Sequence, residues 1–258
     1  MTDGTKFFFV SKKAHFVLFK LDNIQRTIND LLIKACMLIK NLELPDYFKE
    51  HYSRFPKLTP IQEKAINNKL LDQDFENQKV NSQLICAPTA SGKTLVASMA
   101  IANTLGKGKA IYLVPLRALA NEKYKEFQKL LQDTEFKVAM SIGDMDSTSP
   151  YLGQNDLLVL TTEKLDSLMR HNVTWLNQIK LVVIDEIHLL NDPSRGPTLE
   201  IVLTILKSKI KPQMVGLSAT IGNPKALASW LGATLIQDSW RPVTLHKGIF
   251  MDENLEMY

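Results

Sequence analysis

The segment at residues 82–104 restricts the possible folds of this chain most, because a buried strand, a phosphate-loop pattern and a helix follow one another without a gap. The strand-like SQLIC is followed by APTASGKT at 87–94 and by the helical pattern TLVASMAIANTL. Such a loop binds phosphate because backbone N–H groups and the helix N-terminus point at the anion, and glycine permits close approach. Its first residue is Ala87 rather than glycine, and a chance Gly-Lys-Thr at a helix start is the alternative interpretation.

Short apolar runs alternate with helical patterns from residue 82 to residue 236, and this alternation predicts an α/β fold with a parallel sheet. Runs rich in Val, Ile and Leu predict buried strands at Ser82–Cys86, Ala110–Val114, Lys137–Ser141, Leu157–Thr161, Leu181–Ile184 and Met214–Leu217. Helices are predicted at Pro45–Phe55, Pro60–Leu71, Lys93–Thr104, Leu116–Leu131, Glu163–Arg170, Thr198–Lys207 and Pro224–Leu231.

Composition and charge exclude several classes of protein. The apolar runs are far shorter than the roughly 18–20 residues of a membrane span, and no secretory leader is recognisable, so we expect no membrane partner and a cytoplasmic location. The two cysteines, Cys36 and Cys86, lack the spacing of a disulfide framework or a zinc site. The formal charge is +4, but residues 1–36 hold six Lys and Arg against three Asp and Glu. Net charge is therefore weak support for a nucleic-acid partner.

A second chemical pattern is LVVIDEIH at 181–188, an apolar strand that ends in two adjacent carboxylates. Open α/β sheets bind ligands at the carboxyl ends of their strands. In a phosphoryl-transfer site, Asp185 would hold Mg²⁺ through its water shell and Glu186 would polarise the attacking water. From the loop, Lys93 would reach the β and γ phosphates and Thr94 would ligate Mg²⁺. An ordinary charged turn is the alternative, but the phosphate loop on a strand of the same sheet favours catalysis.

Further segments carry a resemblance to the superfamily-two helicases of the DExH kind, in which DEIH is a form of the second motif. PKLTPIQ, VPLRALANEKY, TTEK and SAT resemble the adenine-recognising motif and motifs Ia, Ib and III, in that order, and they begin at residues 56, 114, 161 and 218. RGPTLE at 195–200 and SWRPVTLHKGIF at 239–250 resemble the Ski-two-like branch. LELPDYF and IDEIHLLND are most similar to archaeal repair helicases that unwind DNA at stalled forks.

The resemblance implies a three-layer RecA-like P-loop NTPase domain of the α/β class at residues 37–240, the first of two such domains. Residues 241–258 would begin the linker to the second domain. Residues 1–36 match nothing recognisable and would be an extension upstream of a natural start at Met37 or a functional basic arm. Because relatives take their arginine finger from the second domain, we expect the isolated chain to bind ATP weakly, to hydrolyse it slowly and to unwind nothing.

The resemblance also assigns roles around the cofactors ATP and Mg²⁺. Lys93, Asp185 and Glu186 are the expected catalytic residues, and Thr94 and Asp185 would hold Mg²⁺, partly through water. The amide of Gln62 would select adenine. The remaining nucleotide contacts would come from the loop: Ala87, Pro88, Thr89, Ala90, Ser91, Gly92, Lys93 and Thr94. His188 would couple the site to motif III, which is Ser218, Ala219 and Thr220. A surface histidine at a helix start is the alternative interpretation of His188.

Four residues are expected to contact the phosphates of a nucleic-acid strand without reading its sequence: Arg117, Thr161, Thr162 and Arg195. A helix cap is the alternative for the two threonines, and both roles can coexist because helix N-termini also bind phosphate. A solvated loop arginine, or a contact to another domain, is the alternative for Arg195.

By resemblance, the whole protein would be an ATP-dependent DNA helicase that translocates 3′ to 5′ on single-stranded DNA and repairs or restarts stalled forks. Its partners would be single-stranded or forked DNA and the second RecA-like domain, and the protein would be a monomer. An RNA helicase of the same branch is an alternative, because backbone contacts do not distinguish DNA from RNA. A nucleotide-binding fragment without unwinding activity is another.

Overall fold

The structure is a computed structural model that describes residues 37–143, 150–219, 221–243, 248–251 and 254–257. Chain contacts group Ile39–Tyr258 into one unit. The predictions for residues 1–36, Cys36 and Thr220 fall outside the described residues. No helix in the described part of the chain is long and apolar enough to cross a membrane.

Seven strands form one sheet in which every neighbouring pair is parallel, in the order β3-β4-β2-β5-β6-β1-β7. The strands β1, β2, β4 and β6 are buried along their whole length, as expected for a parallel sheet with both faces covered. The predicted parallel α/β fold is therefore confirmed. The strand bounds are Gln83–Cys86, Lys109–Val114, Val138–Ser141, Leu157–Thr161, Ile179–Ile184, Gln213–Ser218 and Thr234–Gln237 for β1 to β7.

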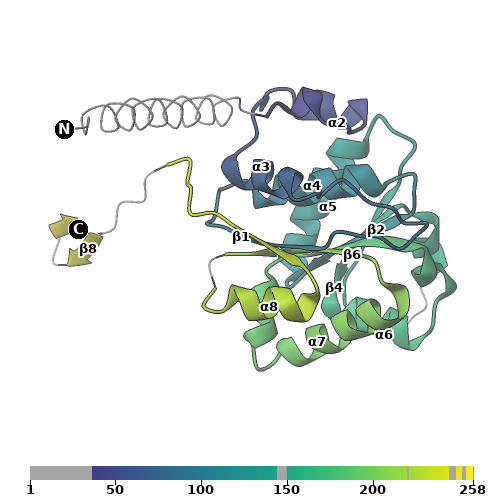
Figure 1. The fold of residues 1–258 in the computed structure, drawn as a ribbon. Coiled ribbons are helices and arrows are strands. Elements are labelled where there is room, and N and C mark those ends of the chain that lie inside the picture. Colours follow the sequence, from purple (N-terminus) through teal and green to yellow (C-terminus); the bar gives the residue numbers. More distant parts are fainter. Residues whose placement is uncertain (1–36, 144–149, 220, 244–247, 252–253, 258) are drawn as a thin grey trace, which may run out of the picture. The chain divides into compact units, whose positions relative to one another are not determined.

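Helices cover both faces of the sheet, which gives three layers (Figure 1). One face carries α3 (Pro60–Asn67), α4 (Lys93–Thr104) and α5 (Arg117–Leu131), and α2 (Asp46–His51) packs on α5. The other face carries α6 (Thr162–Arg170), α7 (Gly196–Ile205) and α8 (Pro224–Leu231). Short turns complete the unit: the 3₁₀ turns η1 (Ile39–Asn41), η2 (Pro150–Gln154), η3 (Thr174–Gln178) and η4 (Ile187–Asn191) and the π turn η5 (Leu206–Ile210).

Three predicted helices differ from the observed ones by two or more residues at an end. The predicted Pro45–Phe55 stops at His51, and the predicted Pro60–Leu71 stops at Asn67. The second helix ends early because Lys69 has a left-handed φ of 66°, which an α-helix does not continue through. The predicted Thr198–Lys207 begins two residues earlier, at Gly196, and passes into the π turn η5.

Three strands were not predicted by the apolar pattern. β7 lies at the edge of the sheet, and only one of its four residues is buried, so its sequence lacks a continuous apolar run. β8 (Gly248–Met251) and β9 (Asn254–Met257) form an antiparallel pair within the segment expected to be a linker. Both strands, GIFM and NLEM, lie outside the alternating block at residues 82–236 from which the strands were predicted.

The turn between η4 and α7 is built around Asp192 and Gly196. The Oδ1 atom of Asp192 accepts hydrogen bonds from the backbone N–H groups of Ser194 and Arg195, both at 2.9 Å. The N–H of Gly196 donates to the carbonyl of Asp192 at 2.8 Å. A Cβ atom on Gly196 would lie 2.3 Å from the carbonyl oxygen of Leu190, so only glycine fits this close approach.

We therefore expect Gly196→Ala to lower the free energy of unfolding by about 1–3 kcal/mol, because the added methyl group collides with backbone. Urea denaturation of the purified chain measures this change. Gly222→Ala is the matched control, since no atom lies within 4 Å of the Cβ it would add; its effect should stay within about 0.5 kcal/mol. Equal stabilities of the two variants would contradict the close approach.

Candidate nucleotide-binding site

The phosphate-loop sequence connects β1 to α4 at the carboxyl edge of the sheet. The N–H of Ala87 donates to the carbonyl of Ser218 at the end of β6, at 3.2 Å. The loop turns through left-handed conformations at Ala90 (φ 65°) and Gly92 (φ 94°). Ala87 is fully buried and has no positive φ, so alanine can replace glycine at this first position without backbone strain.

Lys93 closes the loop upon itself. Its Nζ donates to the carbonyl oxygens of Ala87 at 2.6 Å and Pro88 at 2.9 Å. Burial lowers the pKa of Lys93, and the negative charges of Glu186 and Asp185 act in the opposite direction. The carboxylates at the end of β5 are therefore close enough to Lys93 to influence its pKa. The phosphate loop and the acid pair thus face one site.

Gln62 connects α3 to the same loop. Its Oε1 accepts from the N–H of Thr59 at 2.8 Å, and its Nε2 donates to the carbonyl of Gly92 at 3.0 Å. The hydroxyl of Thr59 donates to the carbonyl of Ser91 at 2.8 Å. The amide of Gln62 is only 3% exposed but keeps a second N–H and a second lone pair. Its contact with adenine stays a prediction.

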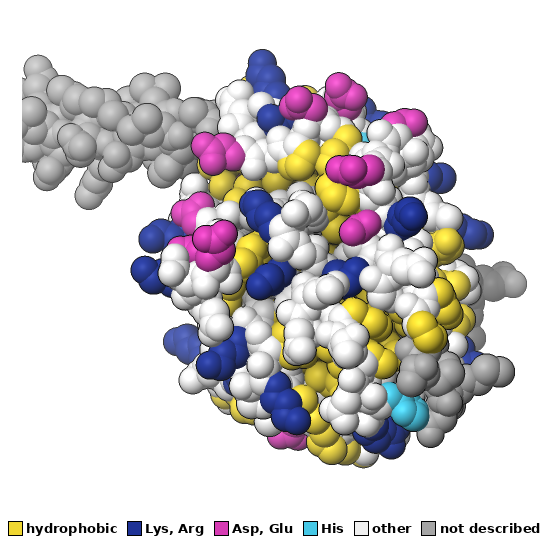
Figure 2. Space-filling view, turned by 90° about the vertical axis from the view of Figure 1, so that its right-hand side faces the viewer, with side chains coloured by type: hydrophobic (Ala, Val, Ile, Leu, Met, Phe, Trp, Pro, Cys, Tyr) yellow, Lys and Arg dark blue, Asp and Glu magenta, His cyan; other side chains and the backbone are white. Residues whose placement is uncertain are grey.

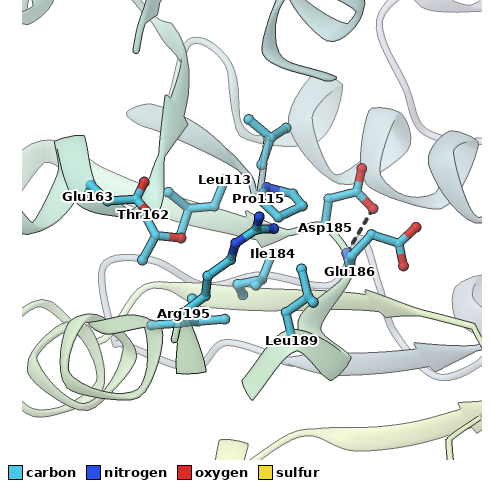
Figure 3. A pocket seen from close by; sticks show the side chains of 11 residues that line it. Leu113, Pro115, Thr162, Glu163, Ile184, Asp185, Glu186, Leu189 and Arg195 are labelled. Carbon is cyan, nitrogen blue, oxygen red and sulfur yellow. Dashed lines mark hydrogen bonds between the residues drawn. The ribbon is translucent and has the colours of Figure 1, made fainter. Parts of the chain in front are cut away.

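The two acids stand at the end of β5, the central strand of the sheet. The N–H of Asp185 continues the pairing with β2 by donating to the carbonyl of Leu113 at 3.0 Å. Glu186 adopts a left-handed φ of 50°, a conformation that costs a non-glycine residue about 1–3 kcal/mol and that clusters at functional sites. The strained turn gives the two neighbouring carboxylates different directions (Figure 3).

His188 lies in η4, the 3₁₀ turn that follows the acid pair. Its Nδ1 is 3.3 Å from Oε2 of Glu186 and 3.4 Å from Oγ of Ser218. The structure thus brings one acid of the pair, the histidine and the first residue of the motif III sequence into contact range. Ala219 is half-buried beside Ser218. The coupling role of this group remains a prediction.

Three of the four residues expected to bind nucleic acid line an open hollow of about 510 Å³, and the fourth, Thr162, lines the neighbouring cavity instead. Arg117 at the start of α5 and the exposed Arg195 line it. Thr161 also lines it but is only 3% exposed, and its hydroxyl accepts from the N–H of Lys164 at 3.4 Å and caps α6. The capping alternative for Thr161 is therefore observed. Contact with nucleic acid stays a prediction for all four residues.

A narrower cavity adjoins this hollow and reaches the acid pair. Thr162 and Glu163 lie on one side of it, Asp185 and Glu186 lie on the other, and Arg195 extends between them (Figure 3). Arg195 lines both cavities. Figure 2 shows Lys and Arg mixed with acidic and apolar side chains on one face of the molecule rather than gathered in a basic stripe.

Two site residues were missed by sequence reasoning. Tyr112 on β2 is fully buried, and its hydroxyl donates to Oδ2 of Asp185 at 2.9 Å. Burial raises the pKa of Tyr112 well above its ordinary value, so the hydroxyl remains a donor. Asp238, just after β7, forms an ion pair with Lys64 of α3 at 2.7 Å, and its N–H donates to the carbonyl of Cys86. An aromatic residue within an aliphatic strand was the available signal for Tyr112.

The donor set for Mg²⁺ is small. The described residues contain no cluster of three or more His, Cys, Asp or Glu side chains suited to a metal. The chain offers the carboxylate of Asp185 and the hydroxyl of Thr94 in the first turn of α4. Mg²⁺ prefers oxygen ligands and usually keeps several waters alongside one or two protein groups and substrate phosphates, so these two residues fit it.

Comparison with known proteins gives matches along most of the chain. The chain is 50% identical to the ATP-dependent DNA helicase Hel308 of Methanococcus vannielii over 77% of its own length, and 48% identical to that of Methanocella arvoryzae over 83%. The Pyrococcus horikoshii Hel308 is 46% identical over 83%. The chain spans only 26% of the first relative and 29% of the other two.

A family model described as DEAD/DEAH box helicase matches residues 59–227, which include the phosphate loop, the acid pair and the Ser218 segment. Because this match covers more than half of the chain and encloses the site described above, the chain belongs to the DEAD/DEAH box helicase family.

Proposed function

We propose that this chain is the ATP-binding and ATP-hydrolysing RecA-like domain of an ATP-dependent DNA helicase. The observation that supports this proposal most is that Lys93, the Asp185–Glu186 pair and His188 lie close together at one edge of the parallel sheet. Similarity to the Hel308 helicases supports it. Since the chain spans about a quarter of these relatives, strand separation would require the rest of such a protein.

Hydrolysis would use the groups in defined roles. Lys93 would exchange the carbonyls of Ala87 and Pro88 for the β and γ phosphates, while the loop N–H groups cradle them. Glu186 would polarise a water molecule that attacks the γ phosphorus, with ADP as the leaving group. Thr94 and Asp185 would hold Mg²⁺, which supplies neutralisation of the charge on the phosphates when bound.

The nucleic-acid strand would pass over the hollow beside α5 and α6. Arg117, Thr162 and Arg195 would contact its phosphates, which positions a strand without reading its sequence. Residues 37–240 would form this domain, and residues 241–258 would lead to a second RecA-like domain. The whole protein would act in the cytoplasm as a monomer, translocating 3′ to 5′ on single-stranded or forked DNA.

Lys93→Ala should weaken ATP binding about 10- to 100-fold, because hydrogen bonds to charged groups contribute about 1.5–3 kcal/mol. Titration of the chain with a fluorescent ATP analogue measures the Kd. Lys107→Ala, the control, removes the same charge beyond the other end of α4, where the Nζ of Lys107 donates to Oδ1 of Asn103 at 3.1 Å. An unchanged Kd for Lys93→Ala would refute the phosphate role.

Glu186→Gln should preserve nucleotide binding and lower kcat about 10²- to 10⁴-fold, because the amide cannot act as a general base. The measurement is steady-state ATP hydrolysis in a protein that joins this domain to its second RecA-like domain. Glu163→Gln, an exposed acid beside the same cavity, is the control and should retain turnover. Hydrolysis that survives in Glu186→Gln would show that another group activates the water.

Arg117→Ala should weaken binding to single-stranded DNA at every sequence, and should reduce the slope of log K against log salt by about 0.7, the value for one phosphate contact. Fluorescence polarisation with labelled oligonucleotides at several salt concentrations tests this. Arg170→Ala is the control, because Arg170 lies at the far end of α6 in an ion pair with Asp166. A parallel series with RNA tests the alternative substrate; binding and ATPase stimulation that favour RNA would replace the DNA assignment.

A further inference from the structure

Tyr112 is an unusual residue for its place in the fold. It is the only aromatic residue among the strands of the seven-stranded sheet, and its side chain is 0% exposed. The other residues of β2 after Lys109 are Ala110, Ile111, Leu113 and Val114. Burial of a hydroxyl group in such surroundings is unfavourable unless a hydrogen-bond partner is available. The partner of Tyr112 is the first acid of the proposed catalytic pair.

The sheet register places the two side chains on one face. Tyr112 lies opposite Val183 in the parallel pairing of β2 with β5. Because side chains alternate along a strand, Asp185 points to the same face as Val183 and therefore as Tyr112. The phenol ring also packs against Phe127 of α5, with 5.3 Å between ring centroids at an interplanar angle of 60°. The ring is thus confined by the strand and by the helix that covers it.

Both oxygens of the Asp185 carboxylate are therefore held by hydrogen bonds from the protein. Oδ1 accepts from the N–H of Glu186 at 3.0 Å, and Oδ2 accepts from the hydroxyl of Tyr112 at 2.9 Å. The donor to Oδ1 is a backbone N–H, which is present whatever side chain stands at position 186. The donor to Oδ2 is the hydroxyl group of Tyr112, which no other residue type in this strand could supply. Without it, the carboxylate could rotate about its terminal bond and would leave one oxygen without its protein partner.

We propose that Tyr112 is a positioning residue for Asp185: its hydroxyl fixes the carboxylate in the orientation that receives Mg²⁺ and its water shell. This inference rests on the proposed function, because it assigns Asp185 to the metal. Each carboxylate oxygen keeps a second lone pair after accepting its hydrogen bond. The hydroxyl of Tyr112 can therefore orient Asp185 and still leave its oxygens able to accept from the water shell of Mg²⁺. Partners of metal ligands change metal affinity or activity about 10- to 100-fold when they are removed.

The test is Tyr112→Phe, which removes the hydroxyl and keeps the ring against Phe127. The affinity of the purified chain for a fluorescent, non-hydrolysable ATP analogue is measured with excess Mg²⁺ and again with EDTA. The ratio of the two affinities is the gain from the metal. We expect Tyr112→Phe to reduce this gain about tenfold, with the EDTA affinity unchanged. A gain equal to that of the unaltered chain would overturn the inference.

Two control variants separate positioning from packing. Tyr124→Phe removes a hydroxyl that accepts from Gln128 at 2.9 Å on α5, away from the acid pair, and should leave the gain unchanged. Phe127→Leu loosens the packing of the Tyr112 ring but keeps its hydroxyl. If Phe127→Leu reduces the gain as much as Tyr112→Phe at equal thermal stability, general packing explains the effect and the positioning role is wrong.

Asp185→Asn distinguishes failure of this inference from failure of the proposed function. If the unaltered chain shows no gain from Mg²⁺, or if Asp185→Asn keeps the full gain, the metal assignment of Asp185 is wrong and the inference falls with it. If Asp185→Asn loses the gain while Tyr112→Phe retains it, the proposed function stands and only the role of Tyr112 is refuted.

Discussion

The parallel pairing of β6 with both β1 and β5 is the constraint on which the site depends. β6 keeps the strand that carries the phosphate loop and the strand that carries the acid pair two positions apart. Strands in a sheet are about 4.8 Å apart, so the two strand ends stand roughly 10 Å from each other, a span suited to phosphates and a metal between them. The bond from the N–H of Ala87 to the carbonyl of Ser218 continues this pairing into the loop. The site is therefore a consequence of strand order.

The charged groups of the site have partners within the domain. Lys93 donates to two carbonyls of its own loop, and Glu186 lies 3.3 Å from His188, which in turn lies 3.4 Å from Ser218. In the proposed function a nucleotide would replace these contacts, and a ligand can shift such a group only by its greater affinity for the rearranged state. Because His188 lies beside both Glu186 and Ser218 at the end of β6, the proposed coupling would pass a change at Glu186 to the neighbouring strand.

Local patterns in the sequence predicted much of the fold, because burial dictates them. The bounds predicted for α4 are those observed, and all six predicted strands are present within a few residues, since runs of Val, Ile and Leu mark strands covered on both faces. β7 was missed because an edge strand is only partly buried. The hydrogen bond of Tyr112 to Asp185 was missed for another reason: its two residues are 73 positions apart, and only strand order brings them together. Gln62 shows the same limit, because no local pattern reveals that its amide binds the carbonyl of Gly92.

The turn at Gly196 connects the chemistry of the acid pair to the hollow beside Arg117. The backbone at Gly196 lies so close to the carbonyl of Leu190 that no side chain fits at this position. This close approach fixes the backbone from which the neighbouring Arg195 side chain extends. Arg195, Pro115 and Glu163 line both the narrow cavity at the acids and the wider hollow. An anion in the hollow and a nucleotide at the acids would therefore act on the same guanidinium group. The two cavities thus share two charged side chains, Arg195 and Glu163. In the proposed function, the guanidinium of Arg195, which extends from a turn that only glycine permits, would connect the two cavities electrostatically without a large movement of the domain.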